Sequence, residues 1–123
     1  MSDAYRHFRE GQKRLRKGMA AQATVPLEKA KRLEPEKASI REALGIAYFR
    51  LARWKEAEQE FRTIVEELSP TDHYAHYALG RALEHQGKTA EANGHYKLAS
   101  SMKPTNKQYA ARIRELDDSD DPE

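Results

Sequence analysis

The sequence predicts an all-helical protein in which three helical hairpins stack on one another and a further helix ends the stack. The first observation is repetition, because Gly11, Gly45 and Gly80 stand 34 and 35 residues apart and the same types of residue follow each of them. Periods of this length are typical of stacked repeat architectures. The second observation is that the repeated residues are spaced three, four and seven positions apart, as on one face of a helix. The third is a proline that closes every unit and stops a helix.

Each unit carries the same types of residue in the same order after its glycine. A small residue comes seven positions later, an alanine five further on, a large apolar residue four after that, and another apolar residue three later. One extra residue precedes the proline of the second unit. In the order of the units, these positions hold Gly18, Ala52 and Gly87; Ala23, Ala57 and Ala92; Leu27, Phe61 and Tyr96; Ala30, Ile64 and Ala99; and Pro35, Pro70 and Pro104.

The first helix of each unit is predicted around the anchor glycine. In unit two Leu44, Tyr48 and Leu51 lie four and three positions apart, and Leu79 and Leu83 repeat the pattern in unit three, so both helices carry an apolar stripe. We expect these helices to end at the small residue seven positions after the anchor. In units one and three this residue is glycine, which adopts without strain the left-handed backbone conformation that helix ends often need. Charged residues replace part of the stripe in unit one, which suits an outermost helix.

The second helix of each unit follows a short break and ends before the closing proline. In unit two its stripe contains Ala57, Phe61, Ile64 and Leu68. Its alanine and the anchor glycine leave room for two backbones to approach, so each unit is predicted to form an antiparallel hairpin, and the hairpins must stack to bury their faces. Pro26 falls inside this helix in unit one, where an interior proline costs about 3 kcal/mol. We therefore predict a kink or a late helix start there.

A seventh helix is predicted after the last closing proline. The stretch from Thr105 to Gln108 has the pattern of a capping box, in which Thr105 is the N-cap and Gln108 bonds back to its backbone. Tyr109, Ile113 and Leu116 then share one face, while the remaining positions are mostly polar. This amphipathic pattern is typical of a terminal helix that shields the last hairpin.

The chain is long enough for one domain, because a protein of 123 residues buries about two thirds of its unfolded surface around a single core. Residues 1–116 hold 22 basic and 15 acidic side chains, a net charge of +7, whereas residues 117–123 hold five acidic side chains and no basic one. We expect this acidic tail to be disordered. The predicted domain spans residues 1–116, with repeats at about 4–37, 38–72 and 73–106 and the capping helix at about 106–116.

Composition and spacing exclude several kinds of site. The chain has no cysteine, which rules out disulfides, thiolate catalysis and zinc sites built on sulfur. The longest uncharged apolar stretch, residues 43–49, is far short of a membrane span or a secretory leader, so we expect a soluble cytoplasmic protein without membrane contact. His73 and His76 stand three apart, but no third ligand is apparent, so we interpret them as solvent-facing and expect no metal or cofactor. No nucleophile stands beside a base, so we predict that the protein is not an enzyme.

Units two and three share a set of small, aromatic and proline residues with a known repeat family. In unit two these are Leu44, Gly45, Tyr48, Ala52, Trp54, Ala57, Phe61 and Pro70, and in unit three Leu79, Gly80, Gly87, Ala92, Tyr96, Ala99 and Pro104. With them, and over roughly residues 4–104, the chain resembles the tetratricopeptide repeat. The resemblance implies a right-handed α-solenoid of three helix-turn-helix repeats, with a concave groove lined mainly by the first helix of each unit. It also implies a noncatalytic adaptor that binds a partner peptide or protein segment, and a core position for Trp54.

The family's groove positions carry over relative to each anchor glycine, at six and three residues before it and one, four and five after it. Of fifteen such positions, seven hold aromatic or aliphatic residues and three hold arginine, a mixture enriched in binding hot spots. The resemblance implies groove contacts from Tyr5, Phe8, Gln12, Arg16, Ile46, Phe49, Arg50, Tyr74, Tyr77 and Arg81. The other five positions hold Leu15, Ser39, Glu42, Glu84 and His85.

These groove residues indicate the chemistry of the partner. Specificity is expected from Phe8, Phe49, Tyr74 and Tyr77 as apolar contacts, and from Arg16, Arg50 and Arg81 as carboxylate partners. We therefore expect a partner segment with apolar anchors and some acidic residues.

One subgroup of the family holds the acidic carboxyl-terminal tail of heat-shock chaperones with lysine and asparagine at defined groove positions. The matching positions here are Phe8, Gln12, Ala43, Tyr74 and Ala78, and none of them is lysine. We therefore do not expect this chain to bind such a tail.

Two other functions stay open. Repeat ends or the groove could pair chains and make the protein a homo-oligomeric structural scaffold. A basic surface on the first unit could instead bind nucleic acid, although glutamates interrupt it and no recognised nucleic-acid motif accompanies it. The acidic tail could also shield a basic surface of the chain. The basic surface of the first unit that could bind nucleic acid consists of Lys13, Arg14, Arg16, Lys17, Lys29, Lys31 and Arg32.

Overall fold

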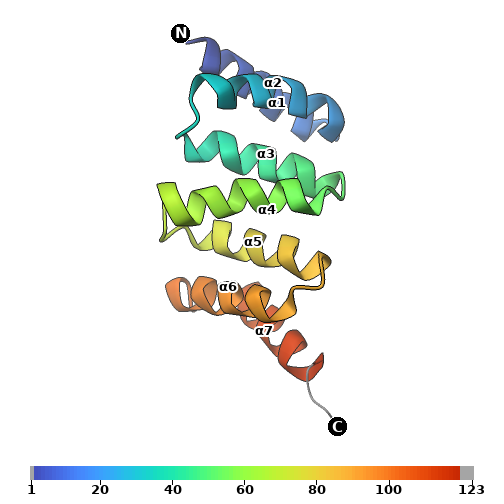
Figure 1. Cartoon of the computed structure of the whole chain (residues 1–123), viewed down its shortest axis with the longest axis vertical. Helices are drawn as coiled ribbons and strands as arrows, with labels where there is room; N and C mark the ends of the chain where they lie inside the picture. The colour runs from blue at the N-terminus through green and yellow to red at the C-terminus, as the bar shows by residue number, and fades with distance from the viewer. Residues whose placement is uncertain (1, 120–123) are drawn as a thin grey trace.

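The computed structural model describes residues 2–119, and over these residues the chain is all-helical. Its helices stack along the long axis of the molecule, with α1 and α7 at opposite ends (Figure 1). Each helix packs against the next one in the chain. The bounds are α1 Asp3–Arg16, α2 Ala20–Leu33, α3 Ala38–Arg50, α4 Trp54–Thr63, the π-helix η1 Ile64–Leu68, α5 His73–His85, α6 Thr89–Met102 and α7 Lys107–Ser119.

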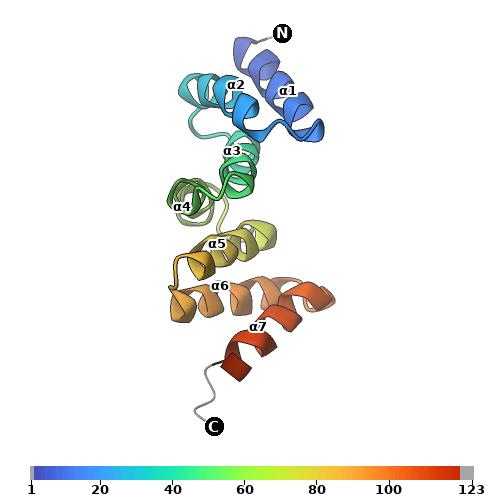
Figure 2. The ribbon, with the colours of Figure 1, turned by 90° about the vertical axis from the view of Figure 1, so that its right-hand side faces the viewer.

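The stack consists of three hairpins and a terminal helix, which confirms the predicted α-solenoid. The hairpins are α1 with α2, α3 with α4 and η1, and α5 with α6. They turn about the long axis, so that α3 and α4 are seen nearly end-on in Figure 2 while the neighbouring helices are seen more from the side. None of the described helices is both long and apolar enough to cross a membrane.

The anchor glycines let the two helices of a hairpin pack closely. A Cβ atom on Gly45 would lie 2.6 Å from the ring of Phe61, and one on Gly80 would lie 2.5 Å from the ring of Tyr96. Both rings are buried, and both belong to the large apolar position of the second helix. Because Gly45 and Gly80 have no side chain, the aromatic ring of the second helix can pack directly against the backbone of the first.

The turns inside the hairpins have a left-handed residue at the predicted place. Gly18 has φ +76° and Gly87 has φ +79°, which confirms the expected helix ends. Ala52 takes the same conformation in unit two, with φ +59°. A residue with a Cβ atom is strained in this region, so the second turn carries a cost that the other two avoid.

Helix α2 runs without interruption through Pro26, so the predicted late helix start is wrong. The missing N–H of Pro26 leaves the carbonyl of Gln22 without its helical partner. The guanidinium of Arg14, on the neighbouring helix, donates a hydrogen bond to that carbonyl over 3.0 Å. Pro26 is itself buried, so packing also holds it in place. A bend at this position stays a prediction.

The extra residue of unit two is absorbed in a wider helical turn. The last five residues before the break, Ile64–Leu68, form the π-helix η1, and the backbone N–H of Ser69 donates to the carbonyl of Ile64 over 2.6 Å. A π-turn accommodates one residue more than an α-turn. The second helix of unit two therefore gains a residue and still delivers Ile64 and Val65 to the core.

Helix α7 begins and ends differently from the prediction. Its N-cap is Asn106, whose side-chain oxygen accepts from the backbone N–H groups of Gln108 and Tyr109, so the predicted N-cap at Thr105 is wrong. The helix continues to Ser119, three residues beyond the expected boundary, so residues 117–119 are helical rather than disordered. The rest of the acidic tail, residues 120–123, lies outside the described residues. Tyr109 is buried, and its hydroxyl bonds to Nδ1 of His73 over 2.8 Å.

Candidate functional site

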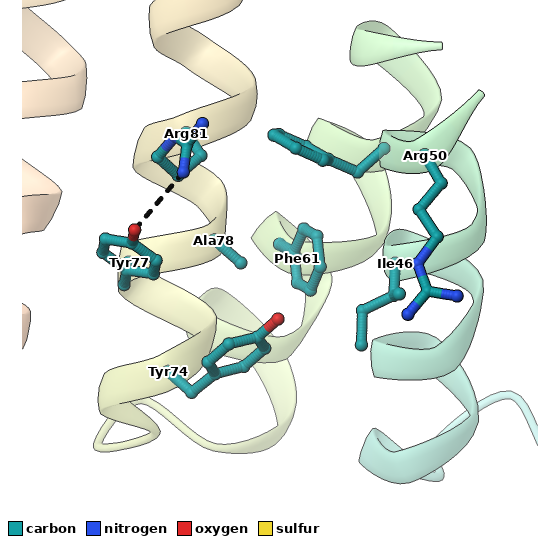
Figure 3. A pocket seen from close by; sticks show the side chains of 8 residues that line it. Ile46, Arg50, Phe61, Tyr74, Tyr77, Ala78 and Arg81 are labelled. Carbon is teal, nitrogen blue, oxygen red and sulfur yellow. Dashed lines mark hydrogen bonds between the residues drawn. The ribbon is translucent and has the colours of Figure 1, made fainter. Parts of the chain in front are cut away.

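A hollow of about 260 Å³ lies between α3 and α5, with α4 beneath it (Figure 3). We call it the aromatic hollow, because four of its eight lining residues carry aromatic rings. Six of the ten predicted groove residues meet here. Its lining consists of Ile46, Phe49 and Arg50 from α3, Phe61 from α4, and Tyr74, Tyr77, Ala78 and Arg81 from α5.

The floor of the aromatic hollow is a residue that sequence reasoning assigned to the core alone. Phe61 is buried, yet it lines the hollow, and its ring meets that of Tyr74 edge-on with centroids 6.4 Å apart. It reaches this place because Gly45 has no side chain in the way. The pairing of a glycine on one helix with an aromatic ring on the next is the signal that could have identified it.

An aromatic cluster lies beside the hollow and includes Phe49 of its wall. Phe49 meets Trp54 edge-on at 4.9 Å between centroids, and Trp54 stacks on His85 at 3.9 Å with the rings 8° apart. Phe49 and His85 also meet edge-on at 5.4 Å. Trp54 is half-buried and contributes to this contact between units two and three rather than to the lining of the hollow. The cluster therefore holds the ring of Phe49 in place on the hollow wall.

Two arginines of the aromatic hollow have neutral partners. Arg50 donates to the carbonyl of Leu15 over 2.9 Å, and so links α3 to the end of α1. Arg81 donates to the Tyr77 hydroxyl over 3.3 Å and lies over the ring of Phe49 at 5.5 Å. Within residues 2–113, whose side chains the structure describes, neither guanidinium forms an ion pair with a carboxylate. Each therefore keeps donors for a negatively charged group.

Two arginines outside the hollow, one on α3 and one on α4, have carboxylate partners instead. Arg41 bonds to the carboxylate of Glu60 over 3.1 Å, and Arg62 bonds to that of Glu58 over 2.9 Å. The two arginines of the aromatic hollow therefore have no carboxylate partner within the part of the chain whose side chains the structure describes, whereas Arg41 and Arg62 are each paired with a glutamate of α4.

A second hollow of about 190 Å³ lies between α1 and α3. We call it the polar hollow. It shares Ile46 with the aromatic hollow, so the two adjoin. Burial of Glu42, and then the nearby charge of Asp72, raise the pKa of the Glu42 carboxyl above its usual value. The lining of the polar hollow is Gln12, Leu15, Arg16, Ser39, Glu42, Ala43 and Ile46.

The structure does not bring every predicted groove residue to these hollows. Gln12 and Arg16 line the polar hollow, but Tyr5 and Phe8 line neither. Tyr5 is 43% exposed near the start of α1, and Phe8 packs against the core. Tyr74 is 38% exposed at the aromatic hollow, where burial of its ring and the charge of Glu42 raise its pKa. The contacts predicted for these ten residues with a partner stay a prediction.

His73 and His76 are not solvent-facing as predicted. His76 is buried, and its Nδ1 lies 3.0 Å from Nδ1 of His95 on α6. Its Nε2 donates to the carbonyl of Pro70 over 2.8 Å, because that oxygen can only accept. His73 is half-buried against Tyr109. No three metal-ligating side chains among the described residues come together as a metal site. The pair spacing of His73 and His76 therefore serves packing.

Comparison with known proteins shows what the chain is similar to. A family model described as tetratricopeptide repeat matches residues 6–73 and 43–106. No curated protein matches the chain.

Several solved structures share the fold. The first TPR of Spaghetti (RPAP3), bound to HSP90 peptide SRMEEVD, has 22% identity and a TM-score of 0.90, over 95% of this chain and 92% of that one. The crystal structure of MamA has 21% identity and a TM-score of 0.91, over 94% of this chain and 67% of that one. The Arabidopsis OM64 TPR domain has 18% identity and a TM-score of 0.87, over 92% and 93%. At these identities the likeness concerns the fold.

Proposed function

The chain belongs to the tetratricopeptide-repeat family, and from that membership we propose that it is a noncatalytic adaptor that binds a segment of a partner protein along α1, α3 and α5. The observation that carries the proposal is the aromatic hollow. It has an apolar floor and walls, and its two arginines have no carboxylate partner among the described side chains. An apolar side chain of the partner would fill it, and an acidic side chain next to that residue would bind Arg50 or Arg81.

The size of the aromatic hollow supports a peptide side chain as its occupant. Small-molecule sites usually have volumes of about 300–1,000 Å³, and this hollow has about 260 Å³. One large side chain suits it better than a whole cofactor. Because such a contact is small, we expect affinity on the order of micromolar.

The neighbouring structures support a peptide as the ligand but not the same peptide. The RPAP3 domain was solved with a chaperone peptide ending in EEVD. In this chain none of the positions that match the lysine and asparagine positions of the chaperone-binding subgroup is lysine. They hold Phe8, Gln12, Ala43, Tyr74 and Ala78. We therefore propose a partner whose apolar residue, rather than its free carboxyl terminus, is the main anchor. We place this adaptor in the cytoplasm, which imaging of a tagged chain would check.

The test is affinity capture with variants of the hollow. Tyr74→Ala combined with Arg81→Ala removes one exposed ring and one cation from the aromatic hollow. Leu98→Ala combined with Lys97→Ala removes an exposed apolar and an exposed basic residue from α6, away from both hollows, and is the matched control. Circular dichroism establishes that both proteins are folded. We expect the partner to be captured by the wild type and the control and lost with the hollow variant.

Two outcomes would count against the proposal. Equal capture by the folded hollow variant would move the binding site off α3 and α5. Sedimentation that shows a stable oligomer, together with capture of no other protein, would favour the structural scaffold instead.

A further inference from the structure

Glu42 is a half-buried carboxylate that lacks a partner at the junction of the two hollows. It lines the polar hollow next to Ile46, which both hollows share. Among the side chains that the structure describes, it forms no hydrogen bond and no ion pair. Its register on α3 is that of Phe8 on α1 and Tyr77 on α5, three residues before the anchor glycine. An acidic side chain thus stands where the other two units have a ring.

The other partly or fully buried glutamates within the described helices have partners. Glu28 accepts from the Tyr48 hydroxyl over 2.7 Å, and Glu84 accepts from that of Tyr96 over 2.7 Å. Glu60 binds both Lys31 and Arg41, over 2.9 and 3.1 Å. Glu58 binds Gln86, Arg62 and Lys88. Glu42 departs from this pattern, which is the pattern expected for carboxylates removed from water.

The surroundings of Glu42 are unfavourable for a negative charge. Burial removes part of its water, and the charge of Asp72, the N-cap of α5, adds repulsion. Arg16 lines the same hollow but is exposed, and it forms no ion pair with Glu42. A positive group brought to this place would relieve both costs, so the site favours a cation.

We propose that Glu42 binds a lysine or arginine side chain of the partner segment, which makes it the residue that selects a basic position in that segment. The segment would then carry a basic residue at the polar hollow, an apolar residue at the aromatic hollow, and an acidic residue near Arg81, in that order along α1, α3 and α5. This inference rests on the proposed function, because it concerns the same bound segment.

The experiment uses random 12-residue peptides displayed on phage. They are selected in parallel against the wild type, Glu42→Gln and Glu34→Gln. Glu34 is the matched control, because it is also partly buried but lies in the loop after α2, beside neither hollow. Glutamine keeps the shape of the side chain and removes the charge. We expect a basic residue at a fixed distance from an apolar one among peptides selected on the wild type and on Glu34→Gln, and loss of the basic preference alone on Glu42→Gln.

A double-mutant cycle measures the contact directly. One selected peptide is made with its basic residue and with glutamine in its place, and both are titrated against the wild type and Glu42→Gln. A charge-assisted hydrogen bond predicts a loss of about 10- to 100-fold on the wild type. The same change in the peptide should make little difference on Glu42→Gln.

The outcomes separate this inference from the proposed function. Selected peptides that lose binding to the Tyr74→Ala, Arg81→Ala variant but show no Glu42-dependent basic residue would overturn the role of Glu42 and leave the adaptor function standing. Peptides that bind this folded variant as well as the wild type, or the absence of any selected peptide, would overturn both.

Discussion

At the scale of single residues, Ala52 shows how one position can keep a fold and still carry strain. The three turns have nearly the same backbone, with φ between +59° and +79°, although only two of them have glycine. Backbone hydrogen bonds hold the shape in unit two as in the others: the N–H of Ala52 donates to the carbonyl of Phe49, and that of Arg53 to Tyr48. The turn therefore imposes the left-handed conformation on Ala52, and this conformation costs free energy because alanine has a Cβ atom.

Replacing this alanine should stabilise the protein. Left-handed backbone costs a residue with a side chain about 1–2 kcal/mol, and the greater freedom of glycine in the unfolded chain takes back about 0.5–1 kcal/mol. Ala52→Gly is therefore expected to raise the free energy of unfolding by about 0.5–1 kcal/mol. Urea denaturation followed by circular dichroism measures it. Gly87→Ala is the converse control and should destabilise; a loss of stability in Ala52→Gly would show that the turn is not strained.

At the scale of elements, the packing of α5 on α6 depends on two histidines that must not both be charged. Burial, and then the neighbouring His76, lower the pKa of His95 below its usual 6.5. Arg62 acts in the same direction, while Glu91 and Glu66 oppose it. In the neutral pair, His76 donates to Pro70 through Nε2 and accepts at Nδ1 from His95. A proton on both rings would put two N–H groups face to face.

Acid should therefore destabilise this hairpin before the carboxylates titrate. Just below the usual pKa of 6.5, the unfolded chain binds a proton at His95 and the folded chain does not, so stability falls as the pH drops through this range. Between about pH 7.5 and about pH 5.5, a range that spans the usual histidine pKa, the wild type should lose more free energy of unfolding than His95→Gln. Urea titrations at both pH values measure the difference. Equal losses in the two proteins would refute the role of the pair.

At the scale of the whole molecule, stability should vary along the stack because its ends have neighbours on one side only. Helix α1 buries only Ala4 and Gly11, both small, whereas the central helix α5 buries Leu79 and Leu83 among others. Glu10 and Arg14 stand in α1 where unit two has Leu44 and Tyr48. Repeat stacks are held by contacts between neighbours, so a terminal helix with little apolar burial opens first.

Hydrogen exchange followed by mass spectrometry tests this gradient. Amides in the middle of α1 should exchange about tenfold or more faster than those in the middle of α5, which corresponds to about 1.4 kcal/mol less free energy of opening. Uniform protection of the two helices would mean that the stack opens as a single unit.

The stack itself could be predicted from the sequence because its information is local and repeated. Helical spacing, an anchor glycine and a closing proline occur three times, so each hairpin confirms the others. What could not be predicted depends on contacts between residues far apart in the chain. Arg14 compensates Pro26 from another helix, and Phe61 reaches the hollow only because Gly45 faces it. Likewise, the sequence does not reveal that Glu42 lacks a partner, because this depends on where its neighbours lie in the folded chain.

The hydrogen bond from Arg50 to the carbonyl of Leu15 has a consequence for the entropy and the kinetics of binding. A solenoid can deform by small rotations of each repeat relative to the next. This bond links the first repeat to α3, the helix that lines both hollows, and so fixes the distance between the two hollows before a ligand binds. When a peptide segment binds a preorganised surface, little entropy is lost in ordering that surface. Competing ligands should then differ chiefly in how quickly they leave.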